Sequence, residues 1–138
     1  MTHEDKELLL QDLSARLPYG VMCNIGLKYP LQLQRIFVDR LDGILLDFYE
    51  DGGNYQVYLS EVKPYLRSLS SMTVEEFKEW LEYCKADYDC EFQPEPTFDF
   101  ESCILSINWL NAHHFDYRGL IEKGLAISVT KENNPYKE

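Results

Sequence analysis

Thiol and imidazole side chains in the second half of the chain are the residues best suited to bind a metal ion. They are Cys84, Cys90, Cys103, His113 and His114, and Zn²⁺ prefers such ligands. Structural zinc sites take ligand pairs about two to four residues apart on a turn, whereas five residues separate Cys84 from Cys90. Adjacent histidines on a helix point about 100° apart, so they rarely bind one ion together. The spacing argues against zinc, and we expect no metal and no cofactor.

The two histidines also lie close to a carboxylate, a combination that can transfer protons. His113, His114 and Asp116 would need a facing nucleophile to form a hydrolytic site. No serine or cysteine stands at a matched position, and the sequence has no nucleophile elbow, P-loop or glycine-rich dinucleotide motif. The simpler interpretation is that one histidine covers the last carbonyls of a helix while Asp116 caps the next helix. We therefore expect a protein that is not an enzyme.

Two acidic segments could bind Mg²⁺ and activate water. Asp47 lies in a strand-like segment, and Glu61-Val62-Lys63 follows the next such segment. The order resembles that of restriction-endonuclease-like enzymes, in which carboxylates bind Mg²⁺ and the lysine assists the attacking water. Pro64 places the triplet at a strand end, and a βαβ pattern is missing around it. A metal-dependent nuclease is our third hypothesis.

The charge of the chain is concentrated in residues 74–101, which hold ten of the 24 acidic residues and two lysines. Glu75, Glu79 and Glu82 share one side of a predicted helix because they stand at i, i+4 and i+7. Such a face, with aromatic residues interleaved, could dock a protein or imitate the phosphates of DNA before a basic cleft. It could also be a solvated helix face whose neighbouring aromatics enter the core.

A second candidate surface is the corner formed by residues 109–118. It contains residue types that are enriched at binding hot spots, and its candidate binding residues are Trp109, His113, His114, Tyr117 and Arg118. Trp109 leaves this set if it proves fully buried.

Length and composition restrict the class of protein. A chain of 138 residues with a net charge of -11 fits one acidic domain and excludes binding to nucleic acid through a basic face. The N-terminus lacks a secretory pattern, and every apolar run is far shorter than the ~20 residues of a membrane helix. We expect a cytoplasmic protein with no membrane contact, whose four cysteines are free thiols.

The first half of the chain predicts a helix followed by short strands. Thr2 caps a helix over 2–17, which Pro18 stops. Alternating residues and the turns Asp42-Gly43 and 51–54 predict strands over 21–25, 35–40, 44–49 and 55–59. Pro64 excludes a central strand over 60–66. These elements predict a small antiparallel sheet or an SH3-like barrel.

The second half predicts a mostly helical part. Ser68–Ser71 is a hinge or linker, and Thr73 with Glu76 forms a capping box for a helix over 74–86 with Val74, Phe77, Leu81 and Cys84 on its buried side. We expect an extended loop over 87–101, a helix over 102–112, a short helix between Asp116 and Gly124, and an edge strand over 125–129, followed by a solvated tail from Lys131.

The predicted fold class is therefore α+β. Residues 1–72 supply the N-terminal helix and the sheet, and residues 73–138 supply a helical part packed with them as one unit. The predicted core residues are Phe37, Val38, Leu45, Phe48, Val57, Leu59, Phe77, Leu81, Ile107 and Leu110.

Two stretches give the chain a family resemblance. They are WLNAHHFDYRGLI at 109–121 and KPYLR at 63–67 followed by SSMT at 70–73. With residues 12–20, they resemble small uncharacterised proteins of Bacteroides-type gut bacteria and of their phages and prophages; residues 21–62 and 85–102 lie outside the resemblance. The resemblance implies a mobile-element setting and no particular activity.

Our leading hypothesis for function is a non-enzymatic interaction or accessory protein with a protein partner and no direct contact with nucleic acid. Its contact surface is the acidic helix face or the 109–118 corner. The runner-up is an acidic inhibitor that mimics DNA. The sequence leaves the oligomeric state and the closure of the sheet open.

Overall fold

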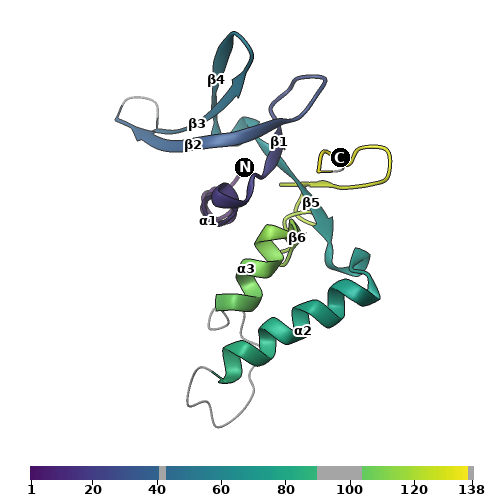
Figure 1. The fold of residues 1–138 in the computed structure, drawn as a ribbon. Helices are drawn as coiled ribbons and strands as arrows, with labels where there is room; N and C mark the ends of the chain where they lie inside the picture. Colours follow the sequence, from purple (N-terminus) through teal and green to yellow (C-terminus); the bar gives the residue numbers. More distant parts are fainter. Residues whose placement is uncertain (41–42, 90–103, 137–138) are drawn as a thin grey trace.

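The computed structural model describes residues 1–40, 43–89 and 104–136, and it has the predicted α+β architecture (Figure 1). No helix among these residues is long and apolar enough to cross a membrane. The elements in chain order are α1 (His3–Arg16), η1 (Leu17–Tyr19), β1 (Met22–Asn24), β2 (Leu31–Asp39), β3 (Gly43–Glu50), β4 (Gly53–Tyr58), η2 (Leu59–Glu61), β5 (Lys63–Ser68), η3 (Leu69–Ser71), α2 (Val74–Asp89), α3 (Ile104–Ala112), β6 (Phe115–Asp116) and β7 (Ile127–Ser128).

The sheet is open and mixed, so of the two predicted alternatives the SH3-like barrel is wrong, whereas the antiparallel sheet describes its strands from β4 to β5. Its strands follow the order β4-β3-β2-β1-β5-β6, and β7 pairs with β5. The strands from β4 to β5 are antiparallel, whereas β6 and β7 both run parallel to β5. The parallel pairs arise because the C-terminal segment returns to β5 after α2 and α3, so it reaches β5 by a crossover and not by a hairpin.

Both predicted hairpins are present. The β2–β3 pairing ends at Asp39 opposite Gly43, so Gly43 belongs to β3 and not to the predicted two-residue turn Asp42-Gly43, whose Asp42 lies outside the described residues. The β3–β4 pairing ends at Glu50 opposite Gly53, which leaves Asp51-Gly52 as a two-residue turn. Gly52 has a φ of 90°, a conformation that side chains with a Cβ rarely adopt.

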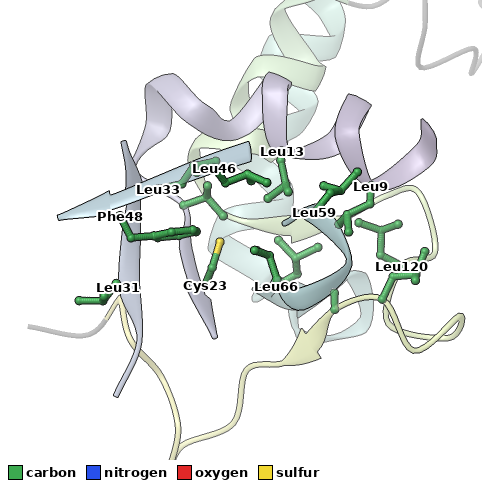
Figure 2. Close-up of a cluster of buried hydrophobic side chains, with 14 residues drawn as sticks. Leu9, Leu13, Cys23, Leu31, Leu33, Leu46, Phe48, Leu59, Leu66 and Leu120 are labelled. Carbon is green, nitrogen blue, oxygen red and sulfur yellow. The ribbon is translucent and has the colours of Figure 1, made fainter. Parts of the chain in front are cut away.

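The main core lies between α1 and the sheet (Figure 2). Thr2 begins α1 by accepting a hydrogen bond from the Asp5 amide. Leu9 and Leu13, one helical turn apart, then pack with Leu33 and Phe48 of the sheet. Further fully buried members of the cluster are Val21, Cys23, Leu46, Leu66 and Leu120.

The exclusion of a central strand through Pro64 is also wrong. Pro64 is the second residue of β5 and stands opposite Cys23 of β1. The strand tolerates it because β1 pairs with only Lys63 and Pro64, while β6 and β7 pair with Tyr65 to Ser68. A proline near the start of a strand removes one donor without interrupting the later pairs.

The helices of the second half follow the prediction in part. The predicted loop over 87–101 is wrong at its start, because α2 extends to Asp89; its remainder lies outside the described residues. The short helix after Asp116 is also wrong. Gly119 has a φ of 77°, which interrupts a right-handed helix, and the segment forms turns whose Leu120 and Ile121 amides donate to the Asp116 carboxylate. The strand predicted over 125–129 appears as β7.

The predicted core is only partly correct. Leu45, Phe48, Leu59 and Leu110 are buried, whereas Phe37, Val57, Leu81 and Ile107 are half-buried. Val38 and Phe77 are wrong, because 76% and 48% of their surfaces are exposed. Val38 lies near the end of β2, which projects past α1 in Figure 1. Phe77 lies on a side of α2 that is not fully covered, and this side forms the candidate site.

Candidate docking groove

An apolar groove of about 420 Å³ opens at the start of α2. It lies between η3, the first two turns of α2 and the middle of α3, and it is lined by Leu69, Met72, Thr73, Val74, Phe77, Trp80 and Leu110. In Figure 1, α3 lies between α1 and α2, so α2 is the outermost helix of the molecule. One side of α2 therefore packs on α3, and the neighbouring side borders the groove.

The exposed part of the groove belongs to the apolar stripe of α2, which consists of Val74, Phe77, Leu81 and Cys84. The stripe was predicted to be buried along its length, and Cys84 at its far end is buried as expected. Burial falls toward the start of the helix: Leu81 is half-buried, Phe77 is 48% exposed and Val74 is 66% exposed. Leu69 of η3, 42% exposed, lines the same groove. Apolar residues gathered in one hollow are typical of a binding surface.

The N-terminal rim of the groove is held by the predicted capping box and one arginine. Thr73 Oγ1 accepts from the Glu76 amide, and Glu76 Oε1 accepts from the Thr73 amide. Arg67 binds both oxygens of Glu76 at 2.7 and 2.8 Å and donates to the Ser71 carbonyl. The hydrogen bonds from Arg67 lower the pKa of Glu76 to about 2. The predicted hinge over Ser68–Ser71 is thus a 3₁₀ turn tied to both β5 and α2.

The side of α2 that faces α3 is fixed by Trp109. Its indole Nε1 donates to Glu79 Oε1 at 3.0 Å, and its ring stacks on Phe115 with centroids 5.8 Å apart. The Arg67 guanidinium also lies against Phe115, 4.1 Å from the centroid of its ring. These contacts set the spacing of α2 and α3, and Leu110 next to Trp109 in the sequence lines the groove.

Most of the predicted acidic face lies on the other side of α2 from the groove. At about 100° per residue, Lys78 and Lys85 project about 80–100° from Phe77. By the same geometry Glu75, Glu79 and Glu82 project about 140–160° from Phe77. The three acids share one helix side, as predicted, but Glu79 accepts the Trp109 hydrogen bond and Glu82 lies 3.6 Å from Lys85. The acidic face and the groove are separate surfaces.

The predicted corner of residues 109–118 is mainly an internal structure. Trp109 is 4% exposed and therefore leaves the set of surface residues. His113 stacks on Trp109 with centroids 3.9 Å apart, and its Nδ1 lies 2.9 Å from the Trp109 carbonyl, the predicted contact of a histidine with the end of a helix. His114 has a φ of 64° and stacks on Tyr136 at 3.5 Å. Burial and the nearby Arg16 lower the pKa of His114 to about 4.

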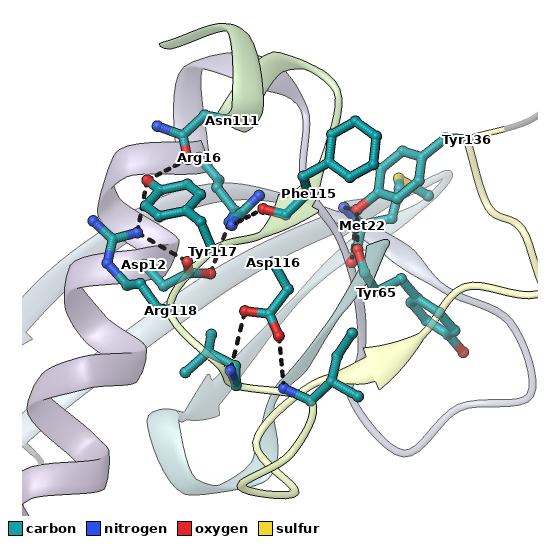
Figure 3. A network of polar contacts seen from close by, with 12 residues as sticks. Asp12, Arg16, Met22, Tyr65, Asn111, Phe115, Asp116, Tyr117, Arg118 and Tyr136 are labelled. Atoms are coloured by element: carbon teal, nitrogen blue, oxygen red, sulfur yellow. Dashed lines mark hydrogen bonds and ion pairs between the residues drawn. The ribbon is translucent and has the colours of Figure 1, made fainter. Parts of the chain in front are cut away.

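Tyr117 and Arg118 belong to a polar network that the sequence did not reveal (Figure 3). Asp12 of α1 accepts from Arg16 at 2.8 Å and from Arg118 at 3.0 Å, and the side chains of Asp12 and Arg16 are completely buried. Arg118 also donates to the Tyr117 hydroxyl, which donates to Asn111, and Arg16 donates to the Phe115 carbonyl. Asp12 and Arg16 stand at i and i+4 of the helix, which is the spacing of an ion pair, but such helix pairs are usually exposed and do not by themselves indicate a buried network. The network joins α1 to the C-terminal segment.

The residues considered for metal chemistry do not converge in the described part of the chain, where no three histidine, cysteine or acidic side chains form a cluster. Cys23 and Cys84 are free thiols there, and Cys90 and Cys103 lie outside it. Asp47 is completely buried, and its Oδ2 lies 2.8 Å from Arg35. Glu61 is exposed in η2. This arrangement adds no support to the nuclease hypothesis.

Comparison with known proteins gives no relative: the chain matches no protein-family model, no curated protein and no solved structure. A proposal for its function therefore depends on the groove and on the charge around it.

Proposed function

We propose that this chain is a non-enzymatic interaction protein that binds a protein partner through the groove between η3, α2 and α3. The observation that carries the proposal is the uncovered apolar stripe of α2. Phe77, Val74 and Leu69 remain exposed around a groove of about 420 Å³ although the periodicity of the helix is that of a buried face.

The energetics support such a role. Complete burial of a leucine, valine or phenylalanine side chain contributes about 1.5–3 kcal/mol, and the three exposed side chains would gain part of this on binding. Arg67, Glu76 and Trp109 hold the surrounding elements in place. A groove fixed before binding loses little conformational entropy when a partner enters it.

The geometry favours a partner that inserts apolar side chains. Hollows beside a helix commonly accept an amphipathic helix, with anchors spaced by three or four residues. Lys78, which follows Phe77 on the exposed surface of α2, favours a carboxylate beside the partner's apolar anchors. The partner surface is expected to be mainly apolar, so its binding should survive salt that screens exposed charges.

The test compares partner capture from a host lysate by the parent chain, Phe77→Ser and Val38→Ser. Val38 is an exposed apolar residue of β2, distant in the fold from the groove, and serves as the matched control. The proposal predicts a partner retained at about 0.5 M salt, where the Debye length is about 4 Å. It also predicts loss of that partner with Phe77→Ser and retention with Val38→Ser.

The same experiment distinguishes docking in the groove from the DNA-mimicry hypothesis. A mimic would lose its partner at high salt and in the double variant Glu75→Gln with Glu82→Gln, because its binding depends on exposed carboxylates. A partner that leaves in salt, or one that Phe77→Ser leaves bound, contradicts docking in the groove.

A further inference from the structure

The open edge of the sheet, in the part of the chain that the structure describes, is formed by a strand whose own sequence does little to prevent pairing. β4 is the terminal strand of the sheet order, and among the described strands it pairs only with β3. Natural edge strands are commonly guarded by charges, prolines or bulges. β4 has the sequence GNYQVY, with no charge and no proline, and its six residues pair with β3 without a register shift.

β4 is also unusually exposed for a strand of this length. Only Val57 is half-buried, and the other five residues are exposed. Tyr55 and Tyr58 expose 37% and 45% of their surfaces, and Tyr49 on the neighbouring strand exposes 49%. Tyrosine is enriched at protein interfaces because it combines a large apolar ring with a polar group.

The register of the hairpin determines which backbone groups face outward. In a two-residue hairpin the pair beside the turn exchanges both hydrogen bonds, and such pairs alternate along the ladder. Starting from Glu50 opposite Gly53, the residues bonded to β3 are Gly53, Tyr55 and Val57. Asn54 and Gln56 therefore direct their N–H and C=O groups to the open edge.

We propose that β4 pairs antiparallel with β4 of a second copy of this chain, about a two-fold axis that passes beside Tyr55. Antiparallel pairing requires outward residues to stand opposite outward residues. With Tyr55 opposite Tyr55 of the second copy, Asn54 stands opposite Gln56 of the second copy, and Gln56 opposite its Asn54. The two pairs form four backbone hydrogen bonds, and the two tyrosines form an aromatic cross-strand pair.

The charges near the edge favour this register over the next one. With the axis at Tyr55, the Asp51-Gly52 turn of each copy lies beside the end of β4 and the start of η2 of the second copy, at Tyr58 and Leu59. Moving the axis to Gln56 would bring the Asp51 end of each hairpin closer to Glu61 of the second copy, in η2 just after β4, and these like charges repel. The register centred on Tyr55 therefore satisfies the outward groups and separates the acids at the hairpin tip.

Sedimentation equilibrium of the parent chain and four variants tests the pairing. Gln56→Pro removes the outward N–H but no bond to β3, and Gln56→Thr is its matched control because it retains that N–H. Gln56→Pro removes two symmetric hydrogen bonds, each contributing about fivefold to affinity, so we expect dimerisation about 25-fold weaker. Tyr55→Glu opposes two carboxylates at the axis and should abolish the dimer, whereas Tyr55→Phe should retain it.

Salt and crosslinking complete the test. Each copy carries a net charge of -11, so dimerisation should tighten with added salt as the long-range repulsion is screened. Tyr55→Cys should form an intermolecular disulfide faster than the parent chain and than Gln56→Cys. Far-UV circular dichroism checks that each variant is folded. If Gln56→Pro does not fold, Tyr55→Glu and the cysteine pair decide the question.

Three results would overturn the proposal. One is a parent chain that stays monomeric at about 100 μM in both low and high salt, a concentration that detects dissociation constants in that range. Another is a dimer that Tyr55→Glu leaves intact. The third is a dimer lost with Phe77→Ser, which would place the contact in the groove. If no partner binds in the groove while the β4 dimer forms, only the proposed function is contradicted.

Discussion

Removal of the Asp12 carboxylate should be among the most damaging single changes in this protein. Asp12 and Arg16 are completely buried, and Asp12 also binds Arg118. Asp12→Ala would leave the Arg16 guanidinium inside the protein with its hydrogen bond to the Phe115 carbonyl and its contact with the Tyr117 ring, but without the carboxylate that neutralises it. Loss of one partner from a buried ion pair costs about 3–5 kcal/mol because the remaining charge is not compensated.

The cost should be visible by thermal and urea unfolding. For a domain of this size each kcal/mol lowers Tm by about 4 °C, so Asp12→Ala should lower Tm by about 12–20 °C. The double variant Asp12→Leu with Arg16→Met removes both charges and should be more stable than Asp12→Ala, since a buried pair is often replaced by apolar residues at little cost. Arg118→Ala, at a residue that is only partly buried, should cost less than Asp12→Ala.

A loss below about 1 kcal/mol for Asp12→Ala would refute this reasoning, because that is the range of an exposed ion pair. A double variant less stable than the single one would also refute it, since it would show that the pair contributes more than the cost of its burial. Near-UV circular dichroism of each variant checks that the native state compared is the same.

Three further predictions concern other parts of the site. The pKa of Glu76 in the folded protein is about 2, against an ordinary value of 4.5. Its contribution to stability should therefore be present above pH 4.5 and be lost as the pH falls toward 2. The urea midpoints of unfolding at pH 3 and pH 6 should differ less in Glu76→Gln than in the parent chain. His114 should titrate near pH 4 by NMR and weaken the fold as the pH falls from 6.5 toward 4, and a midpoint near 6.5 would contradict its burial. Phe77→Ser should change the free energy of unfolding, measured in urea, by less than about 1 kcal/mol because Phe77 is largely exposed. Leu110→Ala should lower the same free energy by about 2–5 kcal/mol because Leu110 is buried. Equal losses in the two variants would place Phe77 in the core.

Local signals in the sequence predicted much of the fold. The turn predicted over 51–54, which the structure narrows to Asp51-Gly52, the Thr73–Glu76 capping box and the helix capped by Thr2 each depend on neighbouring residues, and each is present. The start of β2 was missed although Leu31 and Leu33 alternate with exposed glutamines, the normal pattern of a strand with one buried face.

The errors occur where distant segments meet. Pro64 belongs to a central strand because β6 and β7 return to β5 from the far end of the chain, and no local rule predicts that return. The buried pair of Asp12 and Arg16 resembles an exposed helix pair in sequence, since its burial depends on residues 115–118, about one hundred positions later.

The sequence pointed to the candidate groove only through the wrong prediction that the whole apolar stripe of α2 is buried. The periodicity of Val74, Phe77 and Leu81 indicates a helix face that avoids water, and the sequence cannot distinguish cover by the same chain from cover by a partner. The 109–118 corner was singled out for its residue types, yet Trp109 and Tyr117 are used to pack α3 and to complete the polar network. Residue type alone does not separate these two uses.

Site-specific photo-crosslinking tests the central claim most directly. A photoreactive phenylalanine analogue is placed at position 77 in one chain and at position 38, where an apolar residue is still more exposed, as the control in another. Docking in the groove predicts one protein crosslinked through position 77 and not through position 38, with the yield reduced when Val74→Ser is added. No crosslink at position 77, or the same crosslinked proteins at both positions, would contradict the account.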